Sequence, residues 1–326
     1  MRGYPIPPRT LPSAALRVCC PRTALAGTVR LYSPQRPMST IMVLSDIHAN
    51  LEALEAVFDH VAKTYGRPNR IWCLGDLVGY GPDPGPCVDR LTTWDGVPID
   101  CICGNHDEGV LQVERNALKM ETSREVIAGW EWAAAKLSGT QKQFLAALPP
   151  KRIYTDLPQP VLLVHAAPPE NREQYLLTAK DVEAVLDKFE QRICFFGHTH
   201  MACYFECWPE DRKARPRLFS TEMSTPVEIK SPKIFLNPGA VGQPRWGRLT
   251  PWLPRDAQGG YPLNFVGVSE ASYLWVEILA DAVRVTCHYV AYPFDVTVQK
   301  LKALASASPR LEVPQRWVDR LSEGLR

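Results

Sequence analysis

Long apolar segments are missing from this sequence. No run in its 326 residues approaches the roughly 18 uninterrupted apolar residues that a membrane-spanning helix requires, and the richest runs are as short as residues 161–164. A membrane-spanning role is therefore not expected. Internal repeats and low-complexity blocks are missing too. With 45% hydrophobic and 22% charged residues, the composition is that of an ordinary globular protein.

Cysteine pairs with the spacing C-x-x-C are also missing, although the chain has 10 cysteines. Four of them lie in apolar, strand-like runs, where a thiol packs as a small hydrophobic side chain: Cys73, Cys101, Cys103 and Cys194. A chain of this length does not need disulfides to form a core. We therefore expect structural, reduced cysteines and a cytoplasmic location.

Acidic residues and lysine are absent from residues 1–37, which hold six arginines and seven prolines. The remaining chain keeps 31 of the 37 basic residues against 35 acidic ones, a net charge of −4. A mitochondrial transit peptide is one reading of such a leader, but the prolines oppose the amphipathic helix that this signal needs. We interpret residues 1–37 as a disordered or misassigned extension. Outside it there is no concentrated basic patch, so bulk nucleic acid is not an expected partner.

From Met38 onward, short apolar runs alternate with amphipathic segments. The apolar runs predict strands at residues 41–44, 71–74, 99–103, 152–155, 161–165, 193–196, 202–207, 226–229, 233–236, 273–279 and 283–289. Helical periodicity predicts helices at residues 51–65, 124–137, 140–148, 181–189 and 294–306. This order indicates one domain over residues 38–326, with surface insertions near 208–225 and 245–271, where Pro, Arg, Gly and Trp gather without periodicity.

Polar clusters follow five of the predicted strands, and they contain five of the seven histidines. The clusters are Ser45-Asp46-Ile47-His48, Gly75-Asp76, Gly104-Asn105-His106-Asp107, the single His165, and Gly197-His198-Thr199-His200. Because ligands in α/β sheets bind outside the carboxyl ends of strands, these loops are expected to converge.

A competing interpretation is structural: Asp46 and Asp76 would cap turns, the pair His198 and His200 would bond to backbone, and the lone His165 would be no ligand. The joint occurrence of the clusters favours metal ligation. Mixed Asp, His and Asn ligands without thiolate suit Mn, Fe, Zn or Ni rather than a cysteine-built zinc site. Two such ions roughly 3.5–4 Å apart, bridged by one carboxylate, can activate water and neutralise a phosphate. Hydrolysis of a phosphate ester is the reaction that this pattern indicates.

The four clusters in this order, D-x-H, G-D, G-N-H-D and G-H-T-H, resemble those of the calcineurin-like metallophosphoesterase superfamily. The segments NPGAVGQPR (237–245) and ASY (271–273) resemble its small phosphodiesterase branch, and the resemblance covers residues 40–290. It implies an α/β (α+β) fold, a four-layer sandwich of two mixed β-sheets flanked by helices.

The resemblance also implies a role for each clustered residue. Asp46, His48 and His200 would hold the first of two divalent ions. Asn105, His165 and His198 would hold the second, and Asp76 would bridge them. His106 would not ligate; it would either protonate the leaving alkoxide or stabilise the transition state.

One departure from the family pattern is informative. Protein Ser/Thr phosphatases of this superfamily follow G-D with an Asp that supports the catalytic His and an Arg that grips phosphate, whereas this chain has Gly79 and Tyr80 at those positions. A phosphoprotein phosphatase is therefore not expected. Asp107 or Asp83 remain candidates to orient His106, and Arg245 is a candidate to contact phosphate.

We therefore expect a cytoplasmic hydrolase that uses two divalent ions (Mn, Fe, Zn or Ni) and metal-activated hydroxide to attack a phosphodiester or phosphomonoester bond. A diadenosine-polyphosphate or related nucleotide hydrolase is one alternative, and a catalytically silent metal-binding scaffold is another. The expected partner is a small phosphate ester, nucleotides included, with no bulk nucleic acid and no membrane. The sequence does not indicate the oligomeric state.

Overall fold

A computed structural model describes residues 39–118, 122–219, 224–244 and 270–307, together with residues 317, 318 and 321. These residues belong to one compact unit, Pro37–Arg326. The predicted extension at residues 1–37 and nearly all of the insertion predicted at 245–271 lie outside the described residues. In the described ranges, no helix combines the length and apolar character needed to cross a membrane.

The first sheet has seven strands in the order β10-β13-β12-β1-β2-β4-β3. The strands are β1 (Thr40–Leu44), β2 (Arg70–Cys73), β3 (Thr93–Trp94), β4 (Val97–Cys101), β10 (Val227–Ile229), β12 (Glu270–Ile278) and β13 (Val283–Ala291). Strands β1, β2 and β4 are parallel, whereas β12 pairs antiparallel with β1, so the sheet is mixed. The carboxyl ends of the parallel strands consequently share one edge.

The second sheet has six strands in the order β5-β6-β7-β11-β8-β9. The strands are β5 (Lys151–Tyr154), β6 (Val161–Val164), β7 (Ile193–Phe195), β8 (Ala202–Trp208), β9 (Lys213–Leu218) and β11 (Lys233–Pro238). Here β6, β7 and β11 form the parallel centre, and this sheet too is mixed.

The core lies between these layers, and β1 shows how the sequence builds it. Ile41 and Val43 pack in the apolar cluster between the two sheets, whereas Met42 and Leu44 pack in the cluster under the helices. Successive side chains of a strand point to opposite faces, so a strand covered on both sides is apolar at every position. This is why the central strands are visible in the sequence as short continuous apolar runs.

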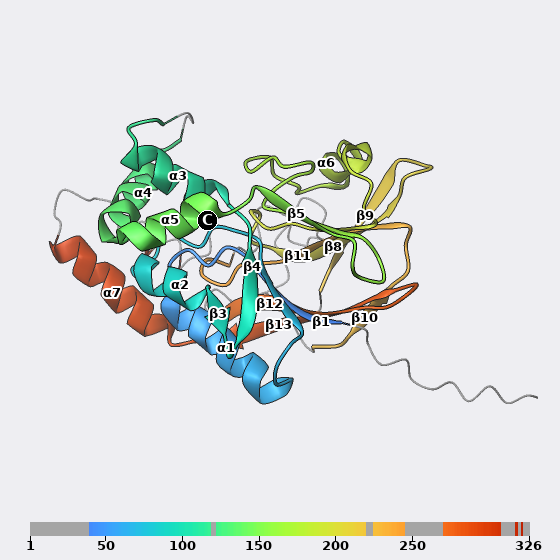
Figure 1. The fold of residues 1–326 in the computed structure, drawn as a ribbon, viewed down its shortest axis with the longest axis horizontal. Coiled ribbons are helices and arrows are strands. Elements are labelled where there is room, and N and C mark those ends of the chain that lie inside the picture. Colours follow the sequence, from blue (N-terminus) through green and yellow to red (C-terminus); the bar gives the residue numbers. More distant parts are fainter. Residues whose placement is uncertain are drawn as a thin grey trace, which may run out of the picture. The chain divides into compact units, whose positions relative to one another are not determined.

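Helices cover the outer faces of both sheets, which completes four layers (Figure 1). On the side of the seven-stranded sheet these are α1 (Leu51–Thr64), α2 (Pro84–Arg90), α3 (Asn105–Glu114), α4 (Arg124–Lys136), α5 (Gly139–Ala147) and α7 (Phe294–Ala307). The other side has α6 (Ala179–Glu183) and the short 3-10 helix η1 (Leu186–Lys188). The fold predicted from the sequence, a four-layer sandwich of two mixed sheets, is confirmed.

Two segments differ from their predictions. The continuous helix predicted at residues 181–189 is wrong, because the chain forms α6 and then η1. Lys233 Nζ donates to the carbonyls of Leu186 and Phe189 at 2.8 and 2.6 Å, which gives these carbonyls a partner other than a continuing helix. The segment 208–225, in which no periodicity was found, contains β9, an exposed edge strand that tolerates Pro216 because an edge position can lack a donor.

Candidate metal centre

The loops that follow β1, β2, β4, β6 and β7 converge and bring the predicted ligands together. Two groups have ligand atoms that all lie within 4.8 Å of one another: Asp46, His48, Asp76 and His200 form one, and Asp76, His165 and His198 form the other. Asp76 belongs to both groups, as expected for a bridging carboxylate. All of these residues are buried, although their sequence positions span more than half of the described chain.

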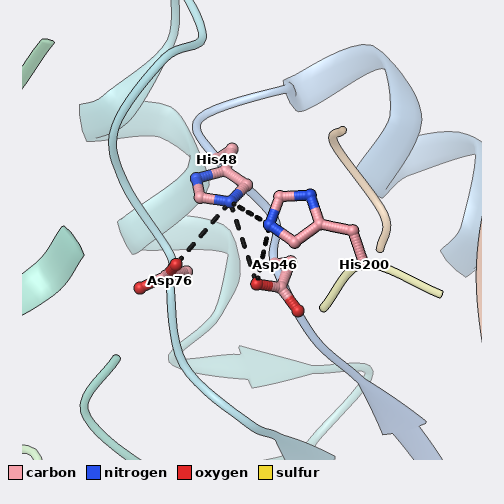
Figure 2. A group of neighbouring side chains, drawn as sticks. All are labelled: Asp46, His48, Asp76 and His200. Atoms are coloured by element: carbon pink, nitrogen blue, oxygen red, sulfur yellow. Dashed lines mark hydrogen bonds and ion pairs between the residues drawn. The ribbon is translucent and has the colours of Figure 1, made fainter. Parts of the chain in front are cut away.

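In the first group the ligand atoms face one another across a short gap (Figure 2). His200 Nε2 lies 3.2 Å from Asp46 Oδ1, and His48 Nε2 lies 3.6 Å from Asp76 Oδ2. The Nε2 atoms of His48 and His200 are only 3.1 Å apart.

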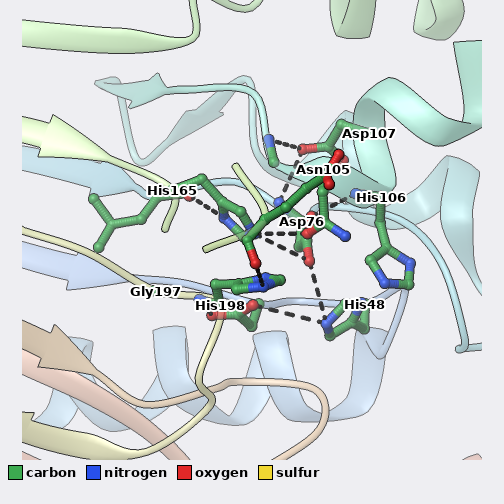
Figure 3. A network of polar contacts seen from close by, with 12 residues as sticks. His48, Asp76, Asn105, His106, Asp107, His165, Gly197 and His198 are labelled. Atoms are coloured by element: carbon green, nitrogen blue, oxygen red, sulfur yellow. Dashed lines mark hydrogen bonds and ion pairs between the residues drawn. The ribbon is translucent and has the colours of Figure 1, made fainter. Parts of the chain in front are cut away.

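In the second group His165 is central (Figure 3). Its Nε2 lies 3.4 Å from Asp76 Oδ2 and 3.0 Å from Asn105 Oδ1. The rings of His165 and His198 meet edge to face, with centroids 5.2 Å apart. Asn105 is the first residue of α3, so the G-N-H-D cluster lies at the start of a helix rather than in a loop.

Each histidine of the two groups has one ring nitrogen close to a backbone carbonyl. The pairs are His48 Nδ1 with Val78 O (3.3 Å), His165 Nδ1 with Leu74 O (2.8 Å), His200 Nδ1 with Gln243 O (2.5 Å) and His198 Nε2 with Glu173 O (3.2 Å). A carbonyl only accepts, so these nitrogens carry the hydrogen, and in the neutral ring the lone pair is on the nitrogen that faces the centre. For His48 and His200, two such lone pairs point at each other, an arrangement that a cation stabilises.

Within the described part of the chain, each of the two aspartates uses one carboxylate oxygen to accept a backbone N–H and leaves the other without a hydrogen bond. Asp46 Oδ2 accepts the backbone N–H of His198 at 3.0 Å, and Asp76 Oδ1 accepts that of His106 at 2.8 Å. Among the described residues, the remaining oxygens, Asp46 Oδ1 and Asp76 Oδ2, are buried without a hydrogen-bond donor. An ionised oxygen in such a position requires a cation, so the donor set fits divalent ions.

Protonation of the centre follows from burial and the packed charges. Burial opposes the negative charge of Asp46 and Asp76, but the neighbouring histidines, His200 and His165 first among them, outweigh it and hold both pKa values well below the usual range. Burial alone would lower the pKa of His165, but the carboxylates of Asp76 and Asp46 raise it to about 9. A metal ion that binds at His165 would therefore have to displace a proton.

Five residues of the two groups adopt the left-handed backbone region. Their φ angles are 54° (Asp46), 46° (His48), 55° (Asp76), 63° (His198) and 63° (His200). Non-glycine residues rarely adopt this conformation, which costs on the order of 1–3 kcal/mol per residue and is concentrated at functional sites. The surrounding sheets hold these turns in place.

His106 lies beside the ligands without belonging to either group. Its ring meets His48 edge to face at 4.8 Å, and burial lowers its pKa to about 4. Neither acid considered from the sequence orients the ring: both oxygens of Asp107 accept backbone N–H groups, and Asp83 pairs with Lys300.

The partner of His106 is Trp130 of α4, whose Nε1–H donates to Nδ1 at 3.0 Å. No sequence signal identified this residue, because a tryptophan on an amphipathic helix is indistinguishable from ordinary core. The other candidate, Arg245, lies outside the described residues.

The family follows from a comparison with known domains. The model of the calcineurin-like phosphoesterase superfamily domain matches residues 39–251, a segment that begins just before β1 and includes every residue of both ligand groups. The chain belongs to this superfamily. The resemblance to the superfamily found in the sequence is thereby confirmed.

The chain is also similar to individual proteins and to a solved structure. The crystal structure of a metallophosphoesterase from Sphaerobacter thermophilus is similar with a TM-score of 0.62 and 28% identity, covering 88% of this chain and 99% of that one. An uncharacterized protein of Methanocaldococcus jannaschii is 33% identical over 211 residues, which are 64% of this chain and 79% of the relative. A symmetrical bis(5'-nucleosyl)-tetraphosphatase of Pseudomonas putida is 30% identical over 154 residues, 46% of this chain and 50% of the relative. The family membership indicates a phosphoester hydrolase that binds divalent metal.

Proposed function

We propose that this protein is a dinuclear metal-dependent phosphoesterase that hydrolyses small phosphodiesters or phosphomonoesters. The observation that carries the proposal is Asp76, a buried carboxylate shared by two ligand groups, with one oxygen fixed by a backbone N–H and the other lacking a donor. Membership of the calcineurin-like superfamily supports the same class of reaction.

In this proposal Asp46, His48 and His200 hold one ion, Asn105, His165 and His198 hold the other, and Asp76 contacts both. Divalent ions bound there supply Lewis acidity, which lowers the pKa of water and neutralises charge on phosphate oxygens. The carbonyls behind the four histidines fix the tautomer and the orientation of these rings. His106 is placed to contact an oxygen of the substrate. The mixed oxygen and nitrogen donors suit Mn, Fe, Zn or Ni.

The test uses the purified full chain, stripped of metal and reloaded separately with each of these ions. Bis-p-nitrophenyl phosphate and p-nitrophenyl phosphate report diester and monoester hydrolysis. We expect turnover that depends on metal and two bound ions per chain by elemental analysis. Two bound ions without turnover of any generic ester would instead support the silent scaffold, and fewer than two would contradict the dinuclear centre.

A nucleotide substrate is the second candidate, and two observations favour it. One relative of this chain is a symmetrical bis(5'-nucleosyl)-tetraphosphatase. In addition, the ring of Tyr175 lies 4.1 Å from that of His198 while the residue stays 40% exposed, so an aromatic face is available next to a ligand. Stacking a base on such a face is favourable.

Tyr175→Ala separates this candidate from the general one. We expect the variant to raise KM for diadenosine tetraphosphate and to leave hydrolysis of glycerol phosphate, which has no ring, unchanged. Wild-type protein that hydrolyses bis-p-nitrophenyl phosphate but not diadenosine tetraphosphate would exclude the nucleotide candidate.

We also propose a reducing, cytoplasmic setting. The eight cysteines in the described part of the chain are free and buried, and burial raises the pKa of several of them, such as Cys87 and Cys194. Buried thiols of this kind are unreactive. Thiol titration of unfolded, unreduced protein should therefore find all 10 cysteines free.

A further inference from the structure

The hydrogen bond between Trp130 and His106 fixes where the imidazole carries its hydrogen. Trp130 is fully buried, and its Nε1–H donates to His106 Nδ1 at 3.0 Å, with the two rings perpendicular at 83°. An indole N–H donates and never accepts. Nδ1 of His106 must therefore be a bare acceptor, which leaves Nε2 as the ring nitrogen that carries hydrogen.

The surroundings hold the ring in this orientation. Tyr80 packs against His106 with centroids 4.5 Å apart, and His48 does so at 4.8 Å. Beside Nδ1 the chain has Gly79, where a Cβ atom would lie only 2.4 Å from that nitrogen. Trp130 and the backbone of Gly79 thus occupy the space beside Nδ1 of His106. Figure 3 shows the His106 ring beside His48, at the margin of the ligand groups.

We propose that Trp130 is a positioning residue that holds His106 as a neutral donor at Nε2, an inference that rests on the proposed phosphoesterase function. In this role His106 stabilises negative charge on a phosphate or leaving-group oxygen through an Nε2–H hydrogen bond. No proton leaves the ring. This resolves the two roles left open by the sequence in favour of transition-state stabilisation.

The kinetic test compares two tryptophan substitutions of the same chemistry. Trp130→Phe removes the indole N–H that bonds His106. Trp72→Phe is the matched control, because Trp72 is also fully buried and its Nε1 has no partner among the described residues. With bis-p-nitrophenyl phosphate, we expect Trp130→Phe to lower kcat by about 10-fold or more, with KM and metal content nearly unchanged. The control should keep kcat near that of the wild type.

A double-mutant cycle separates positioning from general damage. If Trp130 acts through His106, Trp130→Phe should lower kcat much less when His106 is already alanine. Equal losses in both backgrounds would overturn the proposal. Where Trp130→Phe fails to fold, benzothienylalanine at position 130 keeps the shape of the indole and replaces only its N–H, so the same comparison can be made.

The third readout does not require turnover. In zinc-loaded protein labelled with ¹⁵N-histidine, the His106 signals are identified by their loss in His106→Ala. We expect a pyridine-type shift for Nδ1 and a pyrrole-type shift for Nε2; a pyrrole-type Nδ1 would refute the inference. Wild-type protein without phosphoesterase activity would refute the proposed function instead, since the tautomer is observed independently of activity.

Discussion

At the scale of single residues, neighbouring side chains of the candidate metal centre have different roles in our proposal. The free oxygen of Asp76 faces both ligand groups, whereas the ring of His106 lies outside both. Metal binding and turnover should therefore depend on different residues. The two roles can be tested separately, because substituting Asp76 should affect metal binding, whereas substituting His106 should affect turnover alone.

We expect Asp76→Asn to lose bound metal and activity together. The amide carries no charge, and it replaces one of the two carboxylate oxygens by an NH2 group, which donates hydrogen bonds and cannot bind a cation. Substituting a residue that only supports a metal ligand typically lowers metal affinity or activity by roughly 10- to 100-fold, so loss of a shared ligand should lower kcat by at least about 100-fold.

His106→Ala should lower kcat by about 10²- to 10⁴-fold while both ions stay bound. Elemental analysis beside kinetics decides, and equal metal loss in the two variants would contradict this division.

His288 gives a residue-scale prediction away from the metal centre. Burial, followed by His60, lowers its pKa from 6.5 to about 4, and the Tyr65 hydroxyl lies 2.7 Å from Nε2. Between about pH 4 and pH 6.5 the unfolded chain thus binds more protons at this site. The stabilising contribution is complete above this window and is lost as the pH falls through it.

His288→Gln keeps an acceptor for Tyr65 and removes the titrating group. Its Tm should therefore decrease less between pH 6.5 and pH 4 than the Tm of the wild type. Thermal unfolding of both proteins across this window is the measurement. Parallel Tm curves would show that His288 does not contribute to the acid sensitivity of the fold.

The residues of the two candidate ligand groups could be identified from the sequence, and the residues that contact them could not. Asp46, His48 and the others follow strands in a distinctive order, which is a local pattern. Trp130 contacts His106 across 24 positions, and the carbonyls of Leu74 and Gln243 act through backbone, which carries no residue identity. Support of this kind is created only when the chain folds.

At the scale of elements, buried strands were predictable because burial on both faces makes them continuously apolar. Two of the elements that were missed, β9 and α2, lack this signal. In β9 only Ala214 is buried, between the exposed Lys213 and Arg215, and α2 is a short helix that begins at Pro84 and contains Gly85. Neither has the length or the periodicity from which an element can be recognised.

The approach of the β2 and β4 loops gives the prediction that belongs to this scale. A Cβ atom at Gly104 would lie 2.3 Å from the backbone nitrogen of Asp76 and 2.1 Å from its Oδ1. Asp107 joins the same loops by accepting N–H groups from Gly104, Asp76, Leu77 and Val78. We expect Gly104→Ala to push the loops apart, lower Tm and weaken the binding of both ions, since Asp76 is shared.

Gly139→Ala is the matched control, because nothing lies within 4 Å of a Cβ atom built at Gly139 in α5. It should leave metal content unchanged and Tm unchanged or raised, since alanine favours a helix over glycine. Tight binding of two ions by Gly104→Ala would show that the loops can separate without damage to the centre.

At the scale of the whole molecule, the two sheets supply the centre jointly. Asp46, His48, Asp76 and Asn105 follow strands of the seven-stranded sheet, and His165, His198 and His200 follow strands of the six-stranded one. The order of motifs predicted this convergence because parallel strands place their carboxyl ends at one edge. The substrate could not be predicted in the same way, because it depends on loops, and loops have no periodic pattern from which their arrangement can be predicted.

The C-terminal segment is connected to the centre through Tyr80, which gives the prediction at this scale. Trp317, Val318 and Leu321 are buried in one apolar cluster with Tyr80 and with Leu301 of α7. The ring of Tyr80 in turn contacts His48 and His106. Trp317→Ala should lower the free energy of unfolding by about 3 kcal/mol, the usual cost of a large cavity. Kinetics, elemental analysis and thermal unfolding of this variant test the connection.

Because Tyr80 would lose its support, kcat should decrease with both ions still bound. Val296→Ala, an exposed position of α7, is the control and should change stability by less than about 0.5 kcal/mol. If Trp317→Ala lowers Tm but leaves kcat unchanged, the strand loops hold His48 and His106 without the C-terminal segment. In that case the segment stabilises the fold and has no part in the reaction.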